Sequence, residues 1–248
     1  MSGELCSICG EGLFGFGGQS SVAALGTAQA EAVICGMCRR APPHFERAVA
    51  FGSYDGSLRE LLHLLKYEGV RPVAGILGAL LARSIAGAGL TEREFIVVAV
   101  PLHRSRRGQR GFNQAELLAR AAARKLRGNW RIQADCLLRV RPTTSQTGLT
   151  RHQRRANLRG AFKVRNRTQV AGRDILLIDD VLTTGTTAAE CARVLKRAGA
   201  RQVYVATVAR VLKGEDFRTA QTTVLANAAS MMTQTAQAGG TGLRVEPL

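Results

Sequence analysis

The chain has 248 residues, 46% of them hydrophobic, which is enough to bury the core of one domain and a small appendage. It has no apolar run of about 18 residues, and its start lacks the charged and apolar parts of a secretory signal. These features argue against a membrane-spanning or secreted protein and predict a cytoplasmic one. The net charge of +17, from 35 Lys and Arg against 18 Asp and Glu, favours polyanionic ligands such as nucleic acid, phosphorylated metabolites or an anionic membrane surface.

The first pattern along the chain is a pair of CxxC motifs, Cys6 with Cys9 and Cys35 with Cys38. Such pairs are typical of structural sites in which four thiolates surround Zn²⁺ and leave no open position for catalysis. A rubredoxin-like iron site uses the same ligands and stays an alternative. Residues 1–45 are therefore predicted to form a zinc ribbon.

Beyond the cysteines, apolar periodicity predicts alternating helices and strands. Helices are expected at Leu58–Leu65, Pro72–Ile85, Gln114–Leu126 and Thr186–Ala198, and strands at Phe95–Val100, Ala134–Leu138, Asp174–Ile178 and Gln202–Val208, after a short apolar segment at Ala48–Tyr54. Continuous apolar runs suit strands that are buried on both faces, as in parallel sheets. The alternation predicts an α/β domain with right-handed crossovers.

The strongest signal is an apolar run, Ile175–Ile178, followed by Asp179, Asp180 and the turn Thr183–Thr187, which opens a helix. Unpaired amides and the dipole at a helix N-terminus favour phosphate, and hydroxyl groups add donors. Gly185 lets the backbone approach a ligand closely. The two carboxylates can accept hydrogen bonds from a vicinal diol or help to hold a cation, so ribose 5-phosphate fits both halves. The alternative is a buried strand before a Thr-capped helix, with both acids at the surface.

A second cluster contains His103, Arg104, Arg107 and Arg110 and follows the strand Phe95–Val100. A loop after a parallel strand lies at the carboxyl edge of the sheet, where α/β folds bind ligands. These residues are therefore predicted to bind pyrophosphate opposite the acids. A solvated basic turn is the alternative interpretation.

A third basic stretch, Thr143–Phe162, separates two predicted strands. About 20 polar residues are unusual in a compact domain unless they form a lid or bind a ligand. We expect a lid in which Arg155 and neighbouring arginines exclude water and neutralise charge on departing pyrophosphate. A nucleic-acid-binding loop is the alternative.

The segment Ile175–Thr187 resembles the motif by which type I phosphoribosyltransferases bind 5-phosphoribosyl-1-pyrophosphate (PRPP). The resemblance implies a type I phosphoribosyltransferase-like parallel sheet flanked by helices, with PRPP bound together with magnesium. It implies a catalytic set of Asp179, Asp180 and Arg155, with the two acids on the ribose hydroxyls. The PRPP-binding residues that it implies are Asp179, Asp180, Val181, Thr183, Thr184, Gly185, Thr186 and Thr187.

The order of motifs over residues 5–212 resembles the ComF/GntX family of competence proteins. The motifs that carry the resemblance are the CxxC pairs, Leu64-Leu65-Lys66-Tyr67, Pro101-Leu102-His103, Gly111-Phe112-Asn113-Gln114, Gly160-Ala161-Phe162 and the PRPP motif. The resemblance implies a role in DNA uptake during natural transformation. It also implies single-stranded DNA and a competence helicase as partners, and a peripheral position at the inner face of the membrane.

The sequence thus predicts a zinc ribbon at 1–45, a phosphoribosyltransferase-like domain at 46–213 and a low-complexity, disordered tail at 214–248. The predicted function is PRPP binding with magnesium in DNA uptake, and whether the phosphoribosyl group is transferred stays open. Two alternatives also stay open. One is a purine or pyrimidine salvage phosphoribosyltransferase, and the other is a non-catalytic module that binds single-stranded DNA or senses PRPP.

Overall fold

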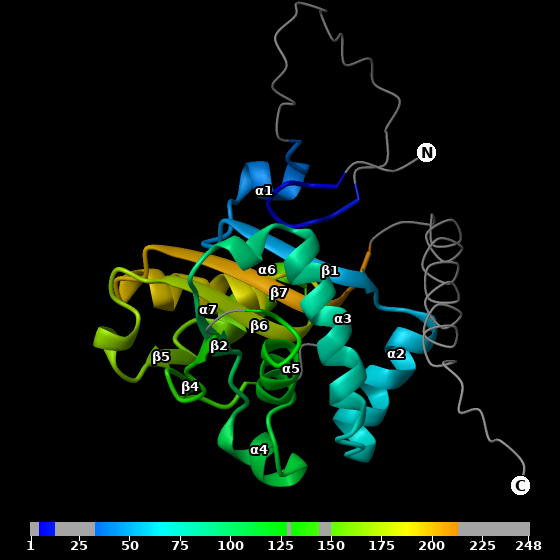
Figure 1. Ribbon diagram of the computed structural model, residues 1–248. Helices are drawn as coiled ribbons and strands as arrows, with labels where there is room; N and C mark the ends of the chain where they lie inside the picture. The colour runs from blue at the N-terminus through cyan, green and yellow to red at the C-terminus, as the bar shows by residue number, and fades with distance from the viewer. Residues whose placement is uncertain (1–4, 13–32, 128–129, 144–149, 213–248) are drawn as a thin grey trace, which may run out of the picture. The chain divides into compact units, whose positions relative to one another are not determined.

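The computed structural model describes residues 5–12, 33–127, 130–143 and 150–212. The centre of the fold is a five-stranded sheet in the order β1-β7-β6-β2-β3, with every neighbouring pair parallel (Figure 1). Its strands are β1 (Arg47–Ser53), β2 (Ile96–Ala99), β3 (Arg131–Ile132), β6 (Asp174–Leu182) and β7 (Gln202–Arg210). An antiparallel hairpin is formed by β4 (Leu137–Arg139) and β5 (Phe162–Val164).

Helices cover both faces of the sheet, and the predicted α/β fold with a parallel sheet is confirmed. The helices are α1 (Gly36–Arg40), α2 (Gly56–His63), α3 (Val73–Gly87), α4 (Arg104–Arg110), α5 (Gln114–Ala123), α6 (Arg151–Leu158) and α7 (Thr186–Arg197). The described residues also form three short helical turns: the π-helical η1 (Leu64–Glu68), and the 3-10 turns η2 (Leu90–Glu92) and η3 (Arg167–Gln169).

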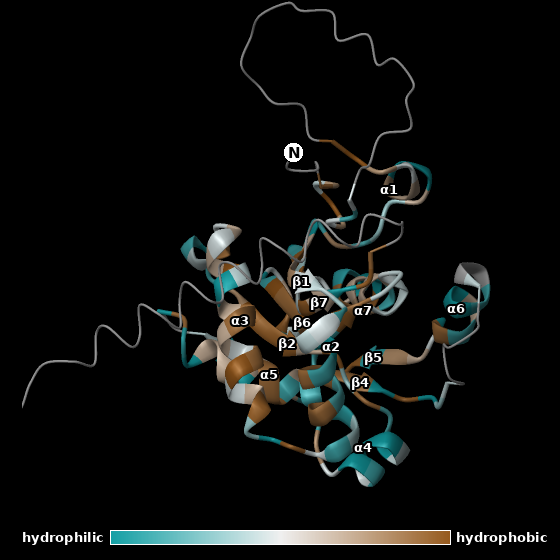
Figure 2. Cartoon of the chain, turned by 90° about the vertical axis from the view of Figure 1, so that its right-hand side faces the viewer, coloured by the Kyte–Doolittle hydropathy of each residue, from teal (hydrophilic) through white to brown (hydrophobic). Residues whose placement is uncertain are grey.

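Successive residues of the central strand enter two different cores. Ile175 and Leu177 of β6 join the core under α7, whereas Leu176 and Ile178 join the core under α3 and α5. Each of the four side chains is at most 1% exposed. Burial on both faces explains why the strand is a continuous apolar run in the sequence. Figure 2 shows the central strands of the sheet in brown, as hydrophobic, between the helices, and α4 and α6 mainly in teal, as hydrophilic.

Two basic stretches that the sequence analysis treated as loops contain helices. The His103 side chain caps α4 by accepting a hydrogen bond from the Ser105 N–H, and Gly111 ends that helix with a φ of 74°. Thr150 and Gln153 form a capping box at the start of α6. Both helices are mostly polar, so they lack the apolar periodicity from which helices are predicted.

The bounds of the predicted helices and strands differ from the observed ones by a few residues, and two of these differences concern the candidate site. Strand β6 continues past Ile178 to Leu182, so both acids lie inside the strand. The helix expected over Leu58–Leu65 is α2, which ends at His63 and continues as η1 up to Gly69. A π-helical turn has no simple sequence signature, and such turns are frequent at functional sites.

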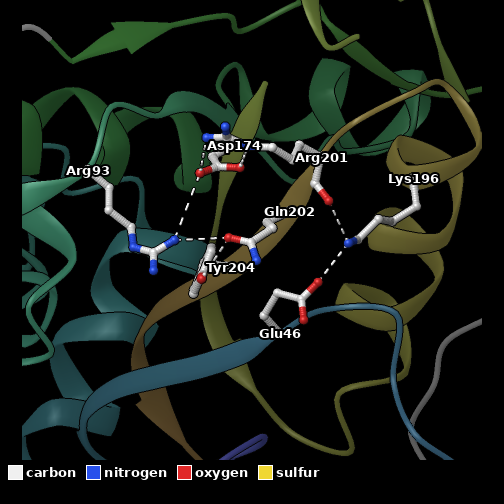
Figure 3. Close-up of polar contacts among 7 residues, drawn as sticks. All are labelled: Glu46, Arg93, Asp174, Lys196, Arg201, Gln202 and Tyr204. Atoms are coloured by element: carbon white, nitrogen blue, oxygen red, sulfur yellow. Dashed lines mark hydrogen bonds and ion pairs between the residues drawn. The ribbon is translucent and has the colours of Figure 1, made fainter. Parts of the chain in front are cut away.

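A polar network ties the amino edge of the sheet together (Figure 3). Asp174 is 4% exposed, and Arg201 donates to both of its carboxylate oxygens over 2.8 and 2.7 Å. These hydrogen bonds hold the pKa of Asp174 below its usual range. Arg93 donates to Gln202 over 2.9 Å and lies 3.9 Å from Asp174, which links the segment before β2 to β6 and β7.

The chain divides into two compact units, Met1–Leu212 and Lys213–Leu248, and the second lies outside the described residues. The tail predicted at 214–248 therefore also lies outside them. Across the described residues, no helix combines the length and the apolar character that a bilayer-spanning helix needs.

Gly78 allows the close approach of α3 to α5. A Cβ atom at Gly78 would overlap the Cβ of Ala121 and lie 2.9 Å from its carbonyl carbon. We expect Gly78→Ala to lower the free energy of unfolding by about 1–3 kcal/mol, as overpacking does in cores. Gly75→Ala, in the same helix, is the control, because a Cβ there meets no atom within 4 Å. It should raise stability by up to about 1 kcal/mol. Urea denaturation of both variants decides, and equal midpoints would contradict the close-packing argument.

Candidate functional site

The two acids of β6 lie at the carboxyl half of the central strand and point to opposite faces. Asp180 is 5% exposed, and its Oδ2 lies 2.8 Å from Nζ of Lys66. Its Oδ1 accepts the N–H of Val181 over 2.7 Å. Asp179 is partly exposed and accepts the N–H of Asp180 over 2.9 Å. Both carboxylates are thus held in fixed orientations, and Asp179 is the more accessible of the two.

The two carboxyl groups differ in charge preference. Burial and the neighbouring Asp180 hold the pKa of Asp179 well above its usual range. Burial also opposes the ionisation of Asp180, but Lys66 outweighs it and keeps the pKa of Asp180 below its usual range. The carboxyl group of Asp179 therefore binds a proton more readily than an ordinary aspartate, whereas Asp180 favours the ionised form. Together the two carboxyl groups offer several hydrogen-bond acceptors to a ligand.

Lys66 reaches Asp180 from the turn η1. Its ammonium group also lies 5.9 Å from the centre of the Tyr54 ring. Although burial lowers the pKa of Lys66, Asp180 raises it above its usual value. The next residue, Tyr67, is 68% exposed and lies beside Arg110, whose guanidinium carbon is 5.7 Å from the ring centre. The turn η1 thus connects the acids of β6 with the basic helix α4.

The loop Thr183–Thr187, called the threonine loop below, joins β6 to α7. Gly185 caps α7 with a φ of 70°, a conformation that favours glycine. The hydroxyl oxygens of Thr184 and Thr186 lie 2.8 Å apart and share a hydrogen bond. The loop therefore presents hydroxyl groups and the N-terminus of a 12-residue helix beside the two acids.

The predicted basic cluster forms the N-cap and body of α4. Arg104 and Arg107 are exposed, and Arg110 donates to Gln114 over 2.7 Å. His103 is occupied by capping, because its Nδ1 lies 2.9 Å from the hydroxyl of Ser105. Since α4 follows β2, which pairs with β6, these residues lie at the same edge of the sheet as the acids. Arg107 also lies 4.0 Å from Glu116 of α5.

The predicted lid is partly described. Residues 144–149 lie outside the described residues, and α6 follows them, anchored by the fully buried Leu158. Arg155 is exposed on this helix. Beyond it, the N–H of Gly160 donates to Glu190 of α7 over 3.2 Å. The basic stretch is therefore fixed to α7 at its C-terminal end.

Arg139, at the end of β4, is a further cation on the Asp179 face. It packs over the ring of Phe162 at 5.5 Å and donates to Thr143. Burial, together with the nearby Arg106, lowers the pKa of Arg139, whereas Asp179 acts in the opposite direction. Each acid of β6 thus has a cation on its own side of the sheet.

The four predicted metal ligands meet in space and form the cysteine cluster. The sulfur atoms of Cys6, Cys9, Cys35 and Cys38 all lie within 4.8 Å of one another, and those of Cys9 and Cys35 are 3.7 Å apart. Zn–S bonds of about 2.3 Å in a tetrahedron place sulfur atoms about 3.8 Å apart. Backbone N–H groups donate to the sulfurs of Cys6 and Cys35 over 3.3 and 3.4 Å. The donor set and spacing fit a closed Zn²⁺ site.

Comparison with known proteins identifies a domain and a family for this chain. Residues 113–238 match the phosphoribosyl transferase domain. The chain is 37% identical over 184 residues to the DNA utilization protein YhgH of Escherichia coli strain K12, covering 72% of this chain and 78% of that protein. It is 31% identical over 180 residues to competence protein F of Haemophilus influenzae, covering 71% and 78%. The chain belongs to the ComF/GntX family.

More distant matches to ComF/GntX proteins and to solved structures extend the comparison. Competence protein ComFC of Bacillus subtilis is 26% identical over 153 residues, which cover 59% of this chain and 57% of that protein. Among solved structures, glutamine PRPP amidotransferase from B. subtilis, complexed with ADP and GMP, has a TM-score of 0.33 at 22% identity. That overlap covers 53% of this chain and 25% of the amidotransferase.

Two cations of the candidate site, Lys66 and Arg139, were not among the site residues predicted from the sequence. Lys66 belongs to a motif that carries the family resemblance, but its pairing with Asp180 depends on the π-helical turn. Arg139 follows a short predicted strand, and its place near Asp179 depends on the β4–β5 hairpin. A lone cation next to apolar residues was the available signal for both.

We expect Lys66→Met to lower the free energy of unfolding at neutral pH by about 3 kcal/mol or more, because the substitution leaves a buried carboxylate without its cation. Since Asp180 has a lowered pKa in the folded protein, its ion pair stabilises the fold above about pH 4. This contribution is lost as the pH falls through the folded pKa of Asp180. The deficit of the variant should therefore shrink as the pH falls, as measured by denaturation at several pH values.

Lys196→Met is the matched control, because Lys196 pairs with Glu46 over 2.6 Å with 31% and 42% of the two side chains exposed. Such a pair contributes less than about 1 kcal/mol. Equal losses in the two Lys→Met variants would argue against a special role for the buried pair.

Proposed function

We propose that the carboxyl edge of the sheet binds PRPP together with magnesium. The observation that carries the proposal is the pair of adjacent acids beside the threonine loop, with Asp179 accessible and Asp180 paired with Lys66. The match of residues 113–238 to the phosphoribosyl transferase domain supports it. The names of the relatives, which concern DNA utilization and competence, do not support a salvage enzyme.

In the proposed complex, the threonine loop binds the 5-phosphate. The first amides of α7 and the Thr hydroxyl groups donate to its oxygens, and the helix dipole favours its charge. The two carboxyl oxygens of Asp179 accept hydrogen bonds from the two ribose hydroxyl groups, a pattern that suits a vicinal diol. Asp180, fixed by Lys66 and Val181, keeps the backbone of the strand end in place. Bound magnesium would supply positive charge to the pyrophosphate oxygens.

The pyrophosphate would lie toward α4. Arg104, Arg107 and Arg110 project from this helix at the same edge as the acids, and Arg155 of α6 is exposed. If the site also transfers the phosphoribosyl group, these cations would stabilise the negative charge that builds up on the leaving pyrophosphate. Movement of the basic stretch before Leu158 would then exclude water from the reacting carbon.

We also propose that the cysteine cluster holds one structural zinc ion. Four thiolates close the coordination sphere, so the metal would stabilise the fold without taking part in the reaction. The segments that carry the ligands have little regular structure apart from α1 and an isolated bridge between Leu5 and Gly12. Their folding would therefore depend on the metal.

Calorimetry with PRPP and magnesium tests the ligand. We expect Asp179→Asn to weaken binding by about tenfold or more, because it alters the hydrogen bonds of the accessible acid to the ribose diol. Asp135→Asn is the control, since Asp135 is an exposed acid whose side chain lies 3.8 Å from Arg165, before β4. No binding by the wild type, or unchanged affinity in Asp179→Asn, would refute the proposed site.

A role in DNA utilization or competence is the proposed setting for this site. The names of the E. coli and H. influenzae relatives support it. The net charge of +17 and the exposed arginines of α4 and α6 fit single-stranded DNA as a partner. A helicase partner would fit the same setting.

We expect the double variant Arg155→Ala with Arg159→Ala to bind single-stranded DNA more weakly. Each phosphate contact that is lost should flatten the salt dependence by about 0.7 in log K per log salt. Arg131→Ala with Arg173→Ala removes the same charge from exposed residues near the amino edge and should change less. Titrations with and without saturating PRPP and magnesium show whether the two ligands share Arg155 and Arg159. Equal slopes in both double variants would place the DNA elsewhere.

A further inference from the structure

Arg210 connects the cysteine cluster to the end of the sheet. It is the last residue of β7 and is only 6% exposed. Its guanidinium group donates to the carbonyl oxygen of Cys9, forms an ion pair with Glu11, and lies 3.8 Å from the sulfur of Cys9. A nearly buried arginine thus has its partners in the first CxxC segment.

The same arginine is in register with the residue that precedes the threonine loop. Arg210 pairs with Leu182, the last residue of β6, and the N–H of Val211 donates to the carbonyl oxygen of Leu182 over 3.0 Å. The position of the strand end at Leu182 is therefore tied to the position of Arg210. Any shift of the first CxxC segment would act on the start of the threonine loop.

Phe45 makes a second connection, through packing. It lies between the second CxxC motif and β1 and is 4% exposed. A Cβ atom at Gly185 would lie 4.0 Å from the ring of Phe45 and 3.9 Å from Leu182. Ile8 and Cys9 pack against the same core as Phe45 and Leu182. Gly185 of the threonine loop therefore lies close to Phe45, which belongs to the segment that follows the cysteines.

We infer that the cysteine cluster and the threonine loop are energetically coupled, with Arg210 and Phe45 as the positioning residues between them. A filled metal site fixes the CxxC segments, and these hold Arg210 and Phe45 against the strand end and Gly185. The loop is then shaped for a phosphate before the ligand arrives. This inference rests on the proposed function and adds that metal loading regulates the affinity for a phosphoribosyl ligand.

Coupling of this kind is reciprocal. If the metal raises the affinity for the ligand by some factor, the ligand raises the affinity for the metal by the same factor. A zinc ion that stabilises only the CxxC segments, with no effect on the threonine loop, would leave the zinc affinity and the ligand affinity independent of each other. A factor that differs from one, measured in both directions, therefore distinguishes coupling from independence, and each measurement checks the other.

Both affinities can be measured on the full-length chain. Zinc transfer to a chromogenic chelator is followed with and without saturating ribose 5-phosphate, which offers a phosphate to the loop and a diol to the acids. Calorimetry with ribose 5-phosphate compares the zinc-loaded and zinc-depleted protein. We expect ribose 5-phosphate to reduce zinc transfer, and zinc depletion to weaken sugar binding, each by about fivefold or more.

Two variants locate the coupling. In Arg210→Gln and in Phe45→Leu, zinc and ribose 5-phosphate should each still bind, but the effect of one on the other should fall toward none. Arg93→Gln, at the amino edge, should keep the full effect. Because the wild-type measurement needs no variant and Phe45→Leu keeps an apolar side chain, the test stands even if Arg210→Gln does not fold.

The outcomes separate the two ideas. If the zinc-loaded wild type binds neither ribose 5-phosphate nor PRPP, the proposed function is wrong, and the coupling is wrong with it. If zinc and the sugar phosphate both bind but neither changes the affinity for the other, only the coupling is overturned. Full coupling in both Arg210→Gln and Phe45→Leu would overturn the assignment of these two residues.

Discussion

The buried ion pair between Lys66 and Asp180 is the interaction on which the candidate site depends. An isolated carboxylate in a packed strand would be protonated or would destabilise the fold, because burial disfavours charge. Lys66 keeps Asp180 ionised, and the carboxyl group of Asp179 stays accessible. The pair also fixes η1 against β6, so that Tyr67 and Arg110 lie at the same edge. One contact thus sets the charge of the acids and the position of their neighbours.

The amino and carboxyl edges of the sheet differ in how their polar side chains are used. At the amino edge, Asp174 is satisfied by Arg201 and lies close to Arg93, which holds the strand starts together. At the carboxyl edge, Asp179 lies in the second half of β6, and the threonine loop connects that strand to α7. A rigid edge opposite a more open one is the usual arrangement of ligand sites in parallel α/β folds.

The cysteine cluster is joined to the domain by more than its linker. Arg210 connects it to β7, and the N–H of Ala48 in β1 donates to the carbonyl oxygen of Ile8 over 2.7 Å. Ile8 and Cys9 also pack against the core under α7. Gly10 has a φ of 71°, and a Cβ there would lie 3.4 Å from the carbonyl oxygen of Ala48. The first CxxC segment therefore packs directly against the edge of the sheet.

The sequence by itself determined the parallel sheet, the cysteine ligands and the family, because each depends on local patterns. Apolar runs mark strands buried on both faces, CxxC spacing brings thiols together, and the acids of β6 and the threonines that follow this strand are close neighbours along the chain. Tertiary structure alone decided which cation meets each acid. Lys66 meets Asp180 through a π-helical turn, Arg139 lies near Asp179 through a hairpin, and Arg210 meets Cys9 across about 200 residues of chain. Such contacts depend on how separate elements pack, and packing leaves no period in the sequence from which a pairing could be predicted.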